Sequence, residues 1–221
     1  SYQEYFERMT DARSWGKPMS ALLGTIRMQK AFELPSIGGK DSMSGTFQNI
    51  NVPPTLIAFG ITTLDARKAI SPEFKEAGHG LYLVKHNHNA DYTPNTEELK
   101  ANFKKVTEEI HNGNIVSAYA IGFGGVAEAV AKMSFGNEIG AVLTCDESTL
   151  FDYSYGSILV EAKEAFEGAV KVGETTAEKC VEVLGEKLSL EELYEANTAK
   201  FEKISPAKGK SGEKCRESNH T

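Results

Sequence analysis

The chain has 221 residues, 40% of them hydrophobic and 25% charged, with a formal net charge of −7. This composition suits a globular protein with an apolar core, and the acidic balance argues against a general nucleic-acid binder. No apolar run has the length of a membrane span, and the N-terminus carries neither a secretory signal pattern nor an initiator Met. We therefore expect a cytoplasmic protein whose true start lies upstream. The three scattered cysteines indicate reduced thiols.

The first predicted helix covers residues 18–33. Pro18 suits the first helical position, and Pro35 ends the helix. Its apolar residues recur at helical spacing, namely Met19, Leu22, Leu23 and Ile26. A glycine-rich segment, PSIGGKDSMSGTF at 35–47, then predicts a loop.

This segment is the first candidate site. Gly38 and Gly39 would let backbone amides form a concave nest for an anion. Lys40 would add a positive charge suited to phosphate. Asp41 could hold Mg²⁺ or orient the lysine, and Ser42 and its neighbour Ser44 could donate hydrogen bonds to phosphate oxygens. The alternative is a tight turn with solvated polar residues.

Further along the chain, helices and strands alternate. The clearest helix covers 95–112, where Asn95 can cap the helix with Glu98 in capping-box position. The other expected elements are strands at 56–59, 81–84, 115–121, 139–143 and 157–160, a short helix from Val126, and a polar helix at 189–202. The tail from 207 to 221 is charged and expected to be disordered. The alternation indicates an α/β or α+β fold.

A second candidate site follows the strand at 115–121. Gly122, Gly124 and Ala127 match the spacing of the dinucleotide fingerprint, and Asp146 lies near the position of a ribose-binding acid. A helix N-terminus at this turn could receive a pyrophosphate. The alternative is that the glycines only allow close packing of helix and strand.

Two further groups could bind metal ions. The stretch KHNHNAD places His86, His88 and Asp91 together, a possible zinc set that is more often a polar turn. The second group could bind Mg²⁺ but suits a solvated acidic loop better, and consists of Asp146, Glu147 and Asp152. The sequence contains no nucleophile elbow of the Gly-x-Ser-x-Gly type.

The chain resembles the phosphoribosylformylglycinamidine synthase family, the large-type glutamine amidotransferases of purine synthesis. The resemblance begins with PSIGGKDSMSGTF followed by VPPTLIAFGI. Further blocks occur in order: WGKPMSALLGTIRMQKAFELP before them, then SPEFKEAGHGLYLV, GFGGVAEAVAKMSFGNEIGAV, FDYSYGSILVE and GETTAEK. They cover about residues 5–205, and matches in this order are more specific than any single motif.

The resemblance implies a domain organisation. Residues 1–72 would be the end of an N-type domain of the aminoimidazole ribonucleotide synthetase superfamily, whose sheet contributes to a central barrel. Residues 73–205 would be the following C-type α/β sandwich, and 206–221 a polar tail. The family uses ATP, Mg²⁺ and glutamine to convert formylglycinamide ribonucleotide to its amidine.

The resemblance also implies partners. The first synthetase unit and the glutaminase domain of the family are missing from this sequence, so we expect an inactive fragment that binds no cofactor by itself. Strand edges left exposed in the truncated N-type domain would favour self-association.

One departure from the family is informative. The family's His-Asp-Arg-Ser-Asp-Gly-Gly, whose first Asp binds Mg²⁺ and whose Ser touches a nucleotide, aligns with residues 119–125. Here the Asp position is Ala120 and the Ser position is Gly122, so we expect no metal ligand and a nucleotide site that is lost or greatly weakened. Gly124 and Gly125 persist. By the same resemblance, Gly38–Ser42 would line the cleft between the two domains.

Three functions remain open. The first is a part of the ligase core, the second a dinucleotide-dependent oxidoreductase built on Gly122–Ala127, and the third a catalytically silent scaffold or dimerisation module. A parallel sheet around the Gly122 turn would favour the oxidoreductase.

Overall fold

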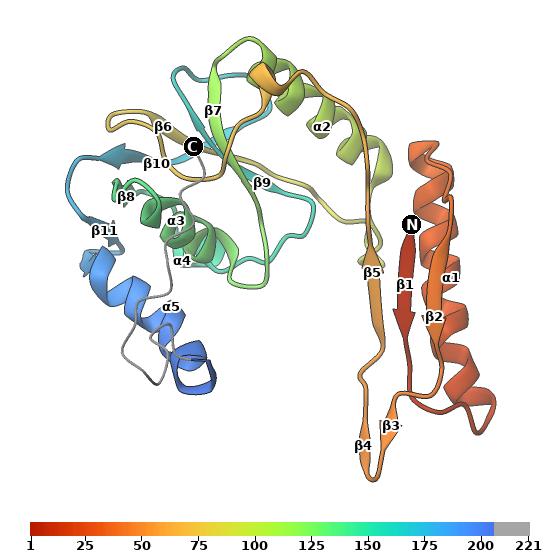
Figure 1. Cartoon of the computed structure of the whole chain (residues 1–221). Helices are drawn as coiled ribbons and strands as arrows, with labels where there is room; N and C mark the ends of the chain where they lie inside the picture. The colour runs from red at the N-terminus through yellow and green to blue at the C-terminus, as the bar shows by residue number, and fades with distance from the viewer. Residues whose placement is uncertain (206–221) are drawn as a thin grey trace. The chain divides into compact units, whose positions relative to one another are not determined.

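The computed structural model describes residues 1–205, which divide into two compact units, Ser1–Arg67 and the residues from Lys68 onward (Figure 1). The assignment of 1–72 and 73–205 to two domain types stays a prediction. The expected tail at 206–221 lies outside the described residues. Within the described part, no helix is long and apolar enough to cross a membrane.

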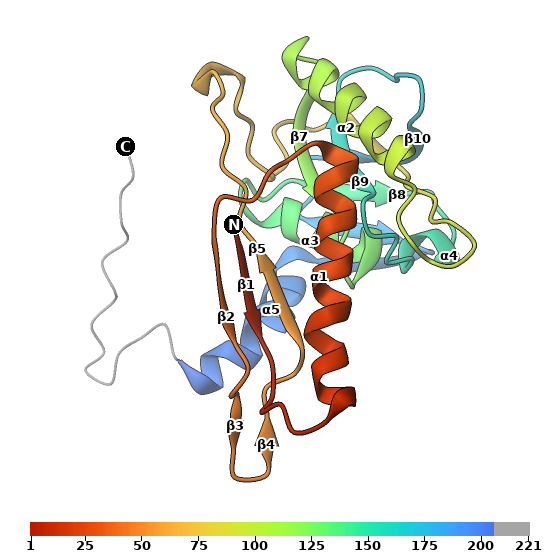
Figure 2. The same ribbon diagram turned by 90° about the vertical axis from the view of Figure 1, so that its right-hand side faces the viewer.

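The first unit is a small sheet with one long helix. Strands β1 (Tyr2–Tyr5), β2 (Gly39–Ser42) and β5 (Thr55–Ala58) form a sheet in the order β2-β1-β5. β2 runs parallel to β1 and β5 antiparallel to it. Helix α1 (Ala12–Phe32) connects the two parallel strands and lies beside the sheet (Figure 2). β3 (Thr46–Phe47) and β4 (Ile50–Asn51) form a hairpin.

Two predictions about this unit were wrong. Helix α1 begins before Pro18, because Asp11 caps it and accepts a hydrogen bond from the Ser14 amide at 2.7 Å. The segment expected to be a loop contains β2. Gly39 is needed there because a Cβ would lie 2.7 Å from the Tyr2 carbonyl oxygen of the neighbouring strand.

Several large apolar residues of α1 are substantially exposed in the first unit. Five of them, which we call the α1 stripe, are between 44% and 58% exposed: Trp15, Met19, Leu22, Leu23 and Ile26. The buried α1 residues are instead Ser14, Pro18 and Thr25. The first unit therefore exposes the surface that an amphipathic helix normally buries.

The second unit is built on a seven-stranded mixed sheet in the order β12-β11-β8-β10-β6-β9-β7. After the 3₁₀ turn η1 (Ala66–Lys68), its strands are β6 (Gly80–Val84), β7 (Ile115–Ala120), β8 (Gly140–Leu143), β9 (Ile158–Ala162), β10 (Val170–Thr176), β11 (Cys180–Val183) and β12 (Glu186–Ser189). Its helices are α2 (Thr96–His111), α3 (Gly125–Phe135), α4 (Glu147–Leu150) and α5 (Leu190–Ile204). All strand pairs are antiparallel except β8 with β11.

Two apolar cores cover the two faces of this sheet. Leu81 and Leu83 of β6 pack with residues of α3 and α5, whereas Tyr82 and Val84 pack with Val106 of α2. This alternation follows from the period of two in a strand. Helices thus lie on both sides of the sheet (Figure 1), as the α/β prediction requires.

The strand order contradicts the dinucleotide-binding alternative. That fold needs the strands before and after the glycine turn to lie in a parallel sheet around a topological switch point. Here β7 is an edge strand that pairs with β9 in antiparallel fashion, and β8 lies between β11 and β10. The parallel sheet that would favour the oxidoreductase alternative is therefore not present around Gly122.

Candidate functional site

The residues predicted to bind a cofactor fall in both units, so we describe each group within its own unit. In the first unit, Gly38, Gly39, Lys40 and Asp41 line a hollow of about 360 Å³ between β1, β2 and α1. No residue from 35 to 47, all of which the structure describes, has a positive φ. The backbone there is extended, and it therefore lacks the geometry of the expected anion nest.

A pair of carboxylates is the main chemical feature of this hollow. Glu4 of β1 stands in register with Asp41 of β2. Glu4 is only 6% exposed, whereas Asp41 is exposed. Burial, and secondly the charge of Asp41, raises the pKa of the Glu4 carboxyl. Sequence reasoning missed Glu4, because its burial depends on α1 and on the pairing of the two strands.

Lys40 does not neutralise this pair. Lys40 lines the hollow too, but among residues 1–205 its ammonium group forms no ion pair with Glu4 or Asp41. Its Nζ donates a long hydrogen bond of 3.4 Å to the Asp41 carbonyl oxygen. The arrangement leaves two like charges facing the hollow.

In the second unit, a carboxylate of the chain itself occupies the N-terminus of α3. The Glu128 side chain accepts a hydrogen bond of 2.8 Å from the Gly124 amide and pairs with Lys132. Hydrogen bonding from Lys132, and secondly from Gly124, lowers the pKa of Glu128. The position where a phosphate would approach the helix therefore already holds an anionic group.

The backbone geometry and packing of this turn explain why Gly124 and Gly125 are glycines. Gly125 has φ of +65°, and a Cβ there would lie 2.6 Å from the Leu150 carbonyl oxygen. A Cβ on Gly124 would lie 2.5 Å from the Cβ of Glu128. These contacts fit the packing explanation, while a cofactor-binding role of Gly124 and Gly125 stays a prediction.

The remaining candidates have structural partners. Asp146 caps α4 and accepts hydrogen bonds from the Thr149 amide and the Ser148 hydroxyl, and these bonds lower its pKa, Thr149 contributing most. Asp152 pairs with Lys85. Among residues 1–205, no three His, Cys, Asp or Glu side chains group closely enough to hold a metal ion.

His86 is a structural residue of the second unit. It is 1% exposed, its Nδ1 lies 2.7 Å from the Tyr155 carbonyl oxygen, and its Nε2 accepts a hydrogen bond from the Asn95 amide. The network thus assigns the proton to Nδ1. Both ring nitrogens are used, which leaves neither for a metal, and His88 packs edge-on against the ring.

Glu161 of β9 is another buried carboxylate that the sequence reasoning missed, and it is fully paired. It accepts hydrogen bonds from the amides of Lys75 and Glu76, the Ser117 hydroxyl and Nδ1 of His79, at 2.7–3.1 Å. The only signal in the sequence is a glutamate inside the apolar run SILVEA. This network ties the segment before β6 to the middle of the sheet.

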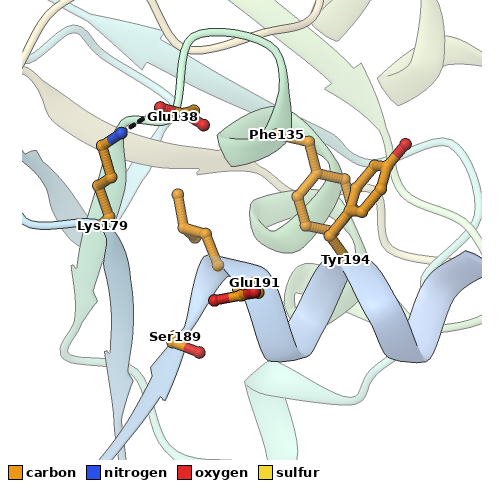
Figure 3. A pocket seen from close by; sticks show the side chains of 7 residues that line it. Phe135, Glu138, Lys179, Ser189, Glu191 and Tyr194 are labelled. Carbon is orange, nitrogen blue, oxygen red and sulfur yellow. Dashed lines mark hydrogen bonds and ion pairs between the residues drawn. The ribbon is translucent and has the colours of Figure 1, made fainter.

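A hollow of the second unit lies beside the start of α5 and has a volume of about 670 Å³ (Figure 3). Phe135 and Tyr194 form an aromatic corner with an interplanar angle of 88°. Lys179 and Glu138 pair on its rim. The Ser189 hydroxyl is engaged in capping α5. The polar groups that line this hollow are thus largely paired or used in capping, and few of them are left to bind a ligand.

Comparison with known proteins gives two kinds of relatives, although no family model matches the chain. Phosphoribosylformylglycinamidine synthase subunit PurL of Lactobacillus delbrueckii subsp. bulgaricus is 23% identical over 209 residues, which cover 77% of this chain and 28% of that protein. The PurL subunit of Thermoplasma volcanium is 28% identical over 159 residues, covering 60% of this chain and 21% of that protein. The chain thus spans roughly a quarter of the length of these relatives.

Solved structures show the same fold. Thermotoga maritima PurL complexed with ATP superposes with a TM-score of 0.62 at 12% identity, over 87% of this chain and 37% of that chain. The PurLQS structure from Thermotoga maritima gives 0.64 at 11% identity, over 87% and 37% of the two chains. The hydrogenase maturation protein HypE gives 0.54 at 14%, over 86% and 74%. The chain is thus distantly homologous to PurL and shares with HypE the fold related to aminoimidazole ribonucleotide synthetase.

Proposed function

We propose that this distant homologue of PurL is a synthetase-like unit of a phosphoribosylformylglycinamidine synthase that serves as framework and not as the site of turnover. In the complete assembly, ATP and Mg²⁺ would activate the formylglycinamide ribonucleotide, and ammonia from glutamine would form the amidine. The sequence relation over 77% of the chain supports the assignment to this ligase. By itself, the chain would be inactive.

The observation that carries the framework role is the N-terminus of α3. The Glu128 carboxylate binds the Gly124 amide there, and Ala120 stands where the resemblance places a Mg²⁺-binding Asp. The side chain of an alanine offers no oxygen to a hard cation, and a second anion would be repelled by Glu128. Both features disfavour a nucleotide at this turn.

A titration of the chain with ADP and Mg²⁺, followed by amide chemical shifts of residues 119–128, tests this role. We expect no saturable change at submillimolar nucleotide. The Glu128→Ala variant would uncover the Gly124 amide and should gain weak affinity for inorganic phosphate. Submillimolar binding of ADP to the wild-type chain at these residues would overturn the proposal.

A growth assay tests the link to purine synthesis. A bacterial strain that lacks PurL needs added purine, and we expect that this chain alone does not restore growth. Restoration would show that the chain carries complete synthetase activity and would contradict the framework role.

Within a full-length enzyme that contains this segment, Lys40→Ala should lower amidine synthesis and leave glutaminase turnover unchanged if Gly38–Ser42 line the site. Unchanged synthesis would count against that role.

The α1 stripe favours an interaction role as well. Five neighbouring apolar side chains at 44–58% exposure form a surface typical of a protein contact. We propose that another synthetase unit covers this surface, and that two copies of the chain associate through it when that unit is absent. Light scattering should show Leu23→Glu to be more monomeric than the wild type, while Phe47→Glu on the β3–β4 hairpin should leave the mass unchanged. A wild-type monomer at high concentration would contradict self-association.

A further inference from the structure

Three aromatic side chains of the second unit form a contiguous exposed group, which we call the aromatic patch: Phe123, Tyr153 and Tyr155. The rings of Phe123 and Tyr153 stack with their centroids 5.8 Å apart, and the rings of Tyr153 and Tyr155 lie 5.9 Å apart. The three residues are nevertheless between 51% and 79% exposed. Aromatic rings that contact one another at the surface, and are not buried, are typical of protein interaction sites.

Strand pairing brings the segments that carry the patch to one edge of the sheet. Ile158 at the start of β9 stands in register with Val84 at the end of β6 and with Ala120 at the end of β7. The segments after β6 and β7 and the segment before β9 therefore lie together. Two of these segments line a hollow of about 500 Å³, whose lining includes Tyr153, Tyr155, Lys85 and Tyr92. The patch thus borders a concave surface.

Buried groups hold the backbone of the patch in place. Nδ1 of the buried His86 donates to the Tyr155 carbonyl oxygen at 2.7 Å, and the buried hydroxyls of Ser154 and Ser157 hydrogen-bond each other at 2.9 Å. Gly156 turns the chain with φ of +93°, and a Cβ there would lie 2.8 Å from Nδ1 of His86. The exposed tyrosines are thus carried by a fixed backbone, which lowers the entropic cost of binding a partner.

The charged groups around the patch indicate which partner it fits. Asp152 lines the hollow beside the tyrosines and also a second, open hollow of about 460 Å³, which Glu147 and Phe151 line as well. Among the described residues that line the two hollows, Lys85 is the only lysine or arginine, and it pairs with Asp152 at 3.2 Å. Two carboxylates therefore stand against one ammonium group, in a chain with a net charge of −7.

An arginine side chain matches both features of this surface. Its guanidinium group is planar, stacks on aromatic faces and can pair with a carboxylate through two parallel hydrogen bonds. A lysine carries the same charge without the planar group, and the carboxylates would repel a nucleic acid. Both partners of the Lys85–Asp152 pair are more than 40% exposed. Because such exposed pairs are weak, a guanidinium group can replace Lys85 on Asp152.

We infer that the aromatic patch is a docking surface for an arginine-containing segment of another protein, whose guanidinium groups stack on the rings of the patch and pair with Asp152 and Glu147. The negative net charge of the chain also favours the encounter with a basic segment. The surface uses residues of the second unit alone and does not depend on the proposed synthetase role.

The experiment titrates the full chain with the acetylated and amidated peptide Gly-Arg-Gly-Arg-Gly and records amide chemical shifts. We expect saturable shifts at Phe123, Tyr153 and Tyr155 at millimolar peptide. Lysine in place of arginine keeps the charge of the peptide but removes the planar group, whereas citrulline keeps the planar group but removes the charge. Both of these peptides should bind at least about threefold more weakly than the arginine peptide.

Matched variants locate the site. Tyr153→Leu keeps an apolar side chain but removes the ring, and it should weaken binding of the arginine peptide about threefold or more. Asp152→Asn removes a carboxylate and should have an effect of similar size. The control is Phe201→Leu on α5, which is 68% exposed, lines neither hollow and should leave the affinity unchanged. If Tyr153→Leu fails to fold, Phe123→Leu on another segment provides the same test.

Four results would overturn the inference. They are the absence of saturable binding at millimolar peptide, equal affinity for the arginine and lysine peptides, equal affinity for the arginine and citrulline peptides, and unchanged affinity in the patch variants. Shifts of the same amides with rising protein concentration, in the absence of peptide, would assign the surface to a second copy of the chain and would equally contradict it. The α3 test measures nucleotide binding, so the two proposals fail independently.

Discussion

Replacing Glu161 by Gln should destabilise the second unit by about 2–4 kcal/mol, although the side chain keeps its size. Oε1 accepts hydrogen bonds from the Glu76 amide and Nδ1 of His79, and Oε2 accepts from the Lys75 amide and the Ser117 hydroxyl. The NH₂ group of the variant must replace one of these oxygens.

The magnitude follows from which donors can adapt. The Ser117 hydroxyl can turn and accept from the new NH₂ group, and His79 can change its tautomer and do the same. A backbone amide cannot, so either orientation of the glutamine leaves the Lys75 or the Glu76 amide facing another donor. One buried unpaired amide costs about 1–3 kcal/mol, and the loss of charge-assisted bonds adds about 1 kcal/mol.

The assay must report on the correct unit. Trp15 is the only tryptophan in the sequence and lies in the first unit, so its fluorescence does not follow the sheet around Glu161. Amide hydrogen exchange of β9, measured under native conditions, gives the opening free energy of the second unit directly. The matched control is Glu164→Gln, an exposed position two residues beyond the end of β9, which should change this free energy by less than about 0.5 kcal/mol.

A decrease of less than about 0.5 kcal/mol in the opening free energy of Glu161→Gln would refute the argument that these four hydrogen bonds fix the segment before β6 to the sheet. Should the variant not fold, Ser117→Ala removes one donor only and should cost about 1 kcal/mol. No measurable cost there would refute the argument equally.

Three further changes have defined outcomes. Gly39→Ala should lower the free energy of unfolding of the first unit by about 1–3 kcal/mol, because its Cβ would lie 2.7 Å from the Tyr2 carbonyl oxygen. Urea unfolding followed by Trp15 fluorescence measures this change. The control Gly60→Ala has open space at the Cβ position and should leave the free energy of unfolding nearly unchanged. Glu73, whose pKa is lowered to about 2 by hydrogen bonds from Lys75 first and Ser71 second, stabilises the fold above pH 4.5. Glu73→Gln should therefore cost up to about 1 kcal/mol at pH 7, and the difference from the wild type should disappear as the pH falls from 4.5 towards 2; a difference that does not depend on pH would contradict the ion pair. His86→Ala should lower the opening free energy of the second unit by about 2–4 kcal/mol, because it leaves the Asn95 amide and the Tyr155 carbonyl without their hydrogen-bond partner. Amide hydrogen exchange measures this energy, and protection equal to that of the wild type would contradict the structural role of His86.

The sequence predicted those elements whose signals are local. Helix α2 was confirmed within one residue at each end, because its apolar stripe and the Asn95 cap lie within the segment itself. The apolar runs at 81–84 and 115–121 predicted β6 and β7 for the same reason. The fold relation to PurL also followed from blocks of sequence in a fixed order.

What the sequence did not predict depends on distant contacts. β11 and β12 were missed because they have only four residues each, although Leu184 and Gly185, both with positive φ, mark the hairpin between them. β10 has seven residues but was missed as well, because three of its seven residues are exposed and it contains no continuous apolar run. The β2 segment was taken for a loop because its glycines suggested turns, when Gly39 serves the close approach of β1. The environments of Glu4 and Glu161 arise from strand pairing and from partners more than 30 residues away in the sequence. The composition of the local segment does not indicate such partners.

The two units thus distribute polarity in opposite ways, and this contrast bears on where function resides. The second unit buries apolar residues on both faces of its sheet, and it pairs the fully buried carboxylate of Glu161. The first unit instead exposes the α1 stripe and buries Ser14 and Thr25 of the same helix. Stable folds bury apolar surface, so the exposed stripe calls for a protein partner outside the first unit. For this reason Leu23→Glu should lower the mass of the particle in light scattering.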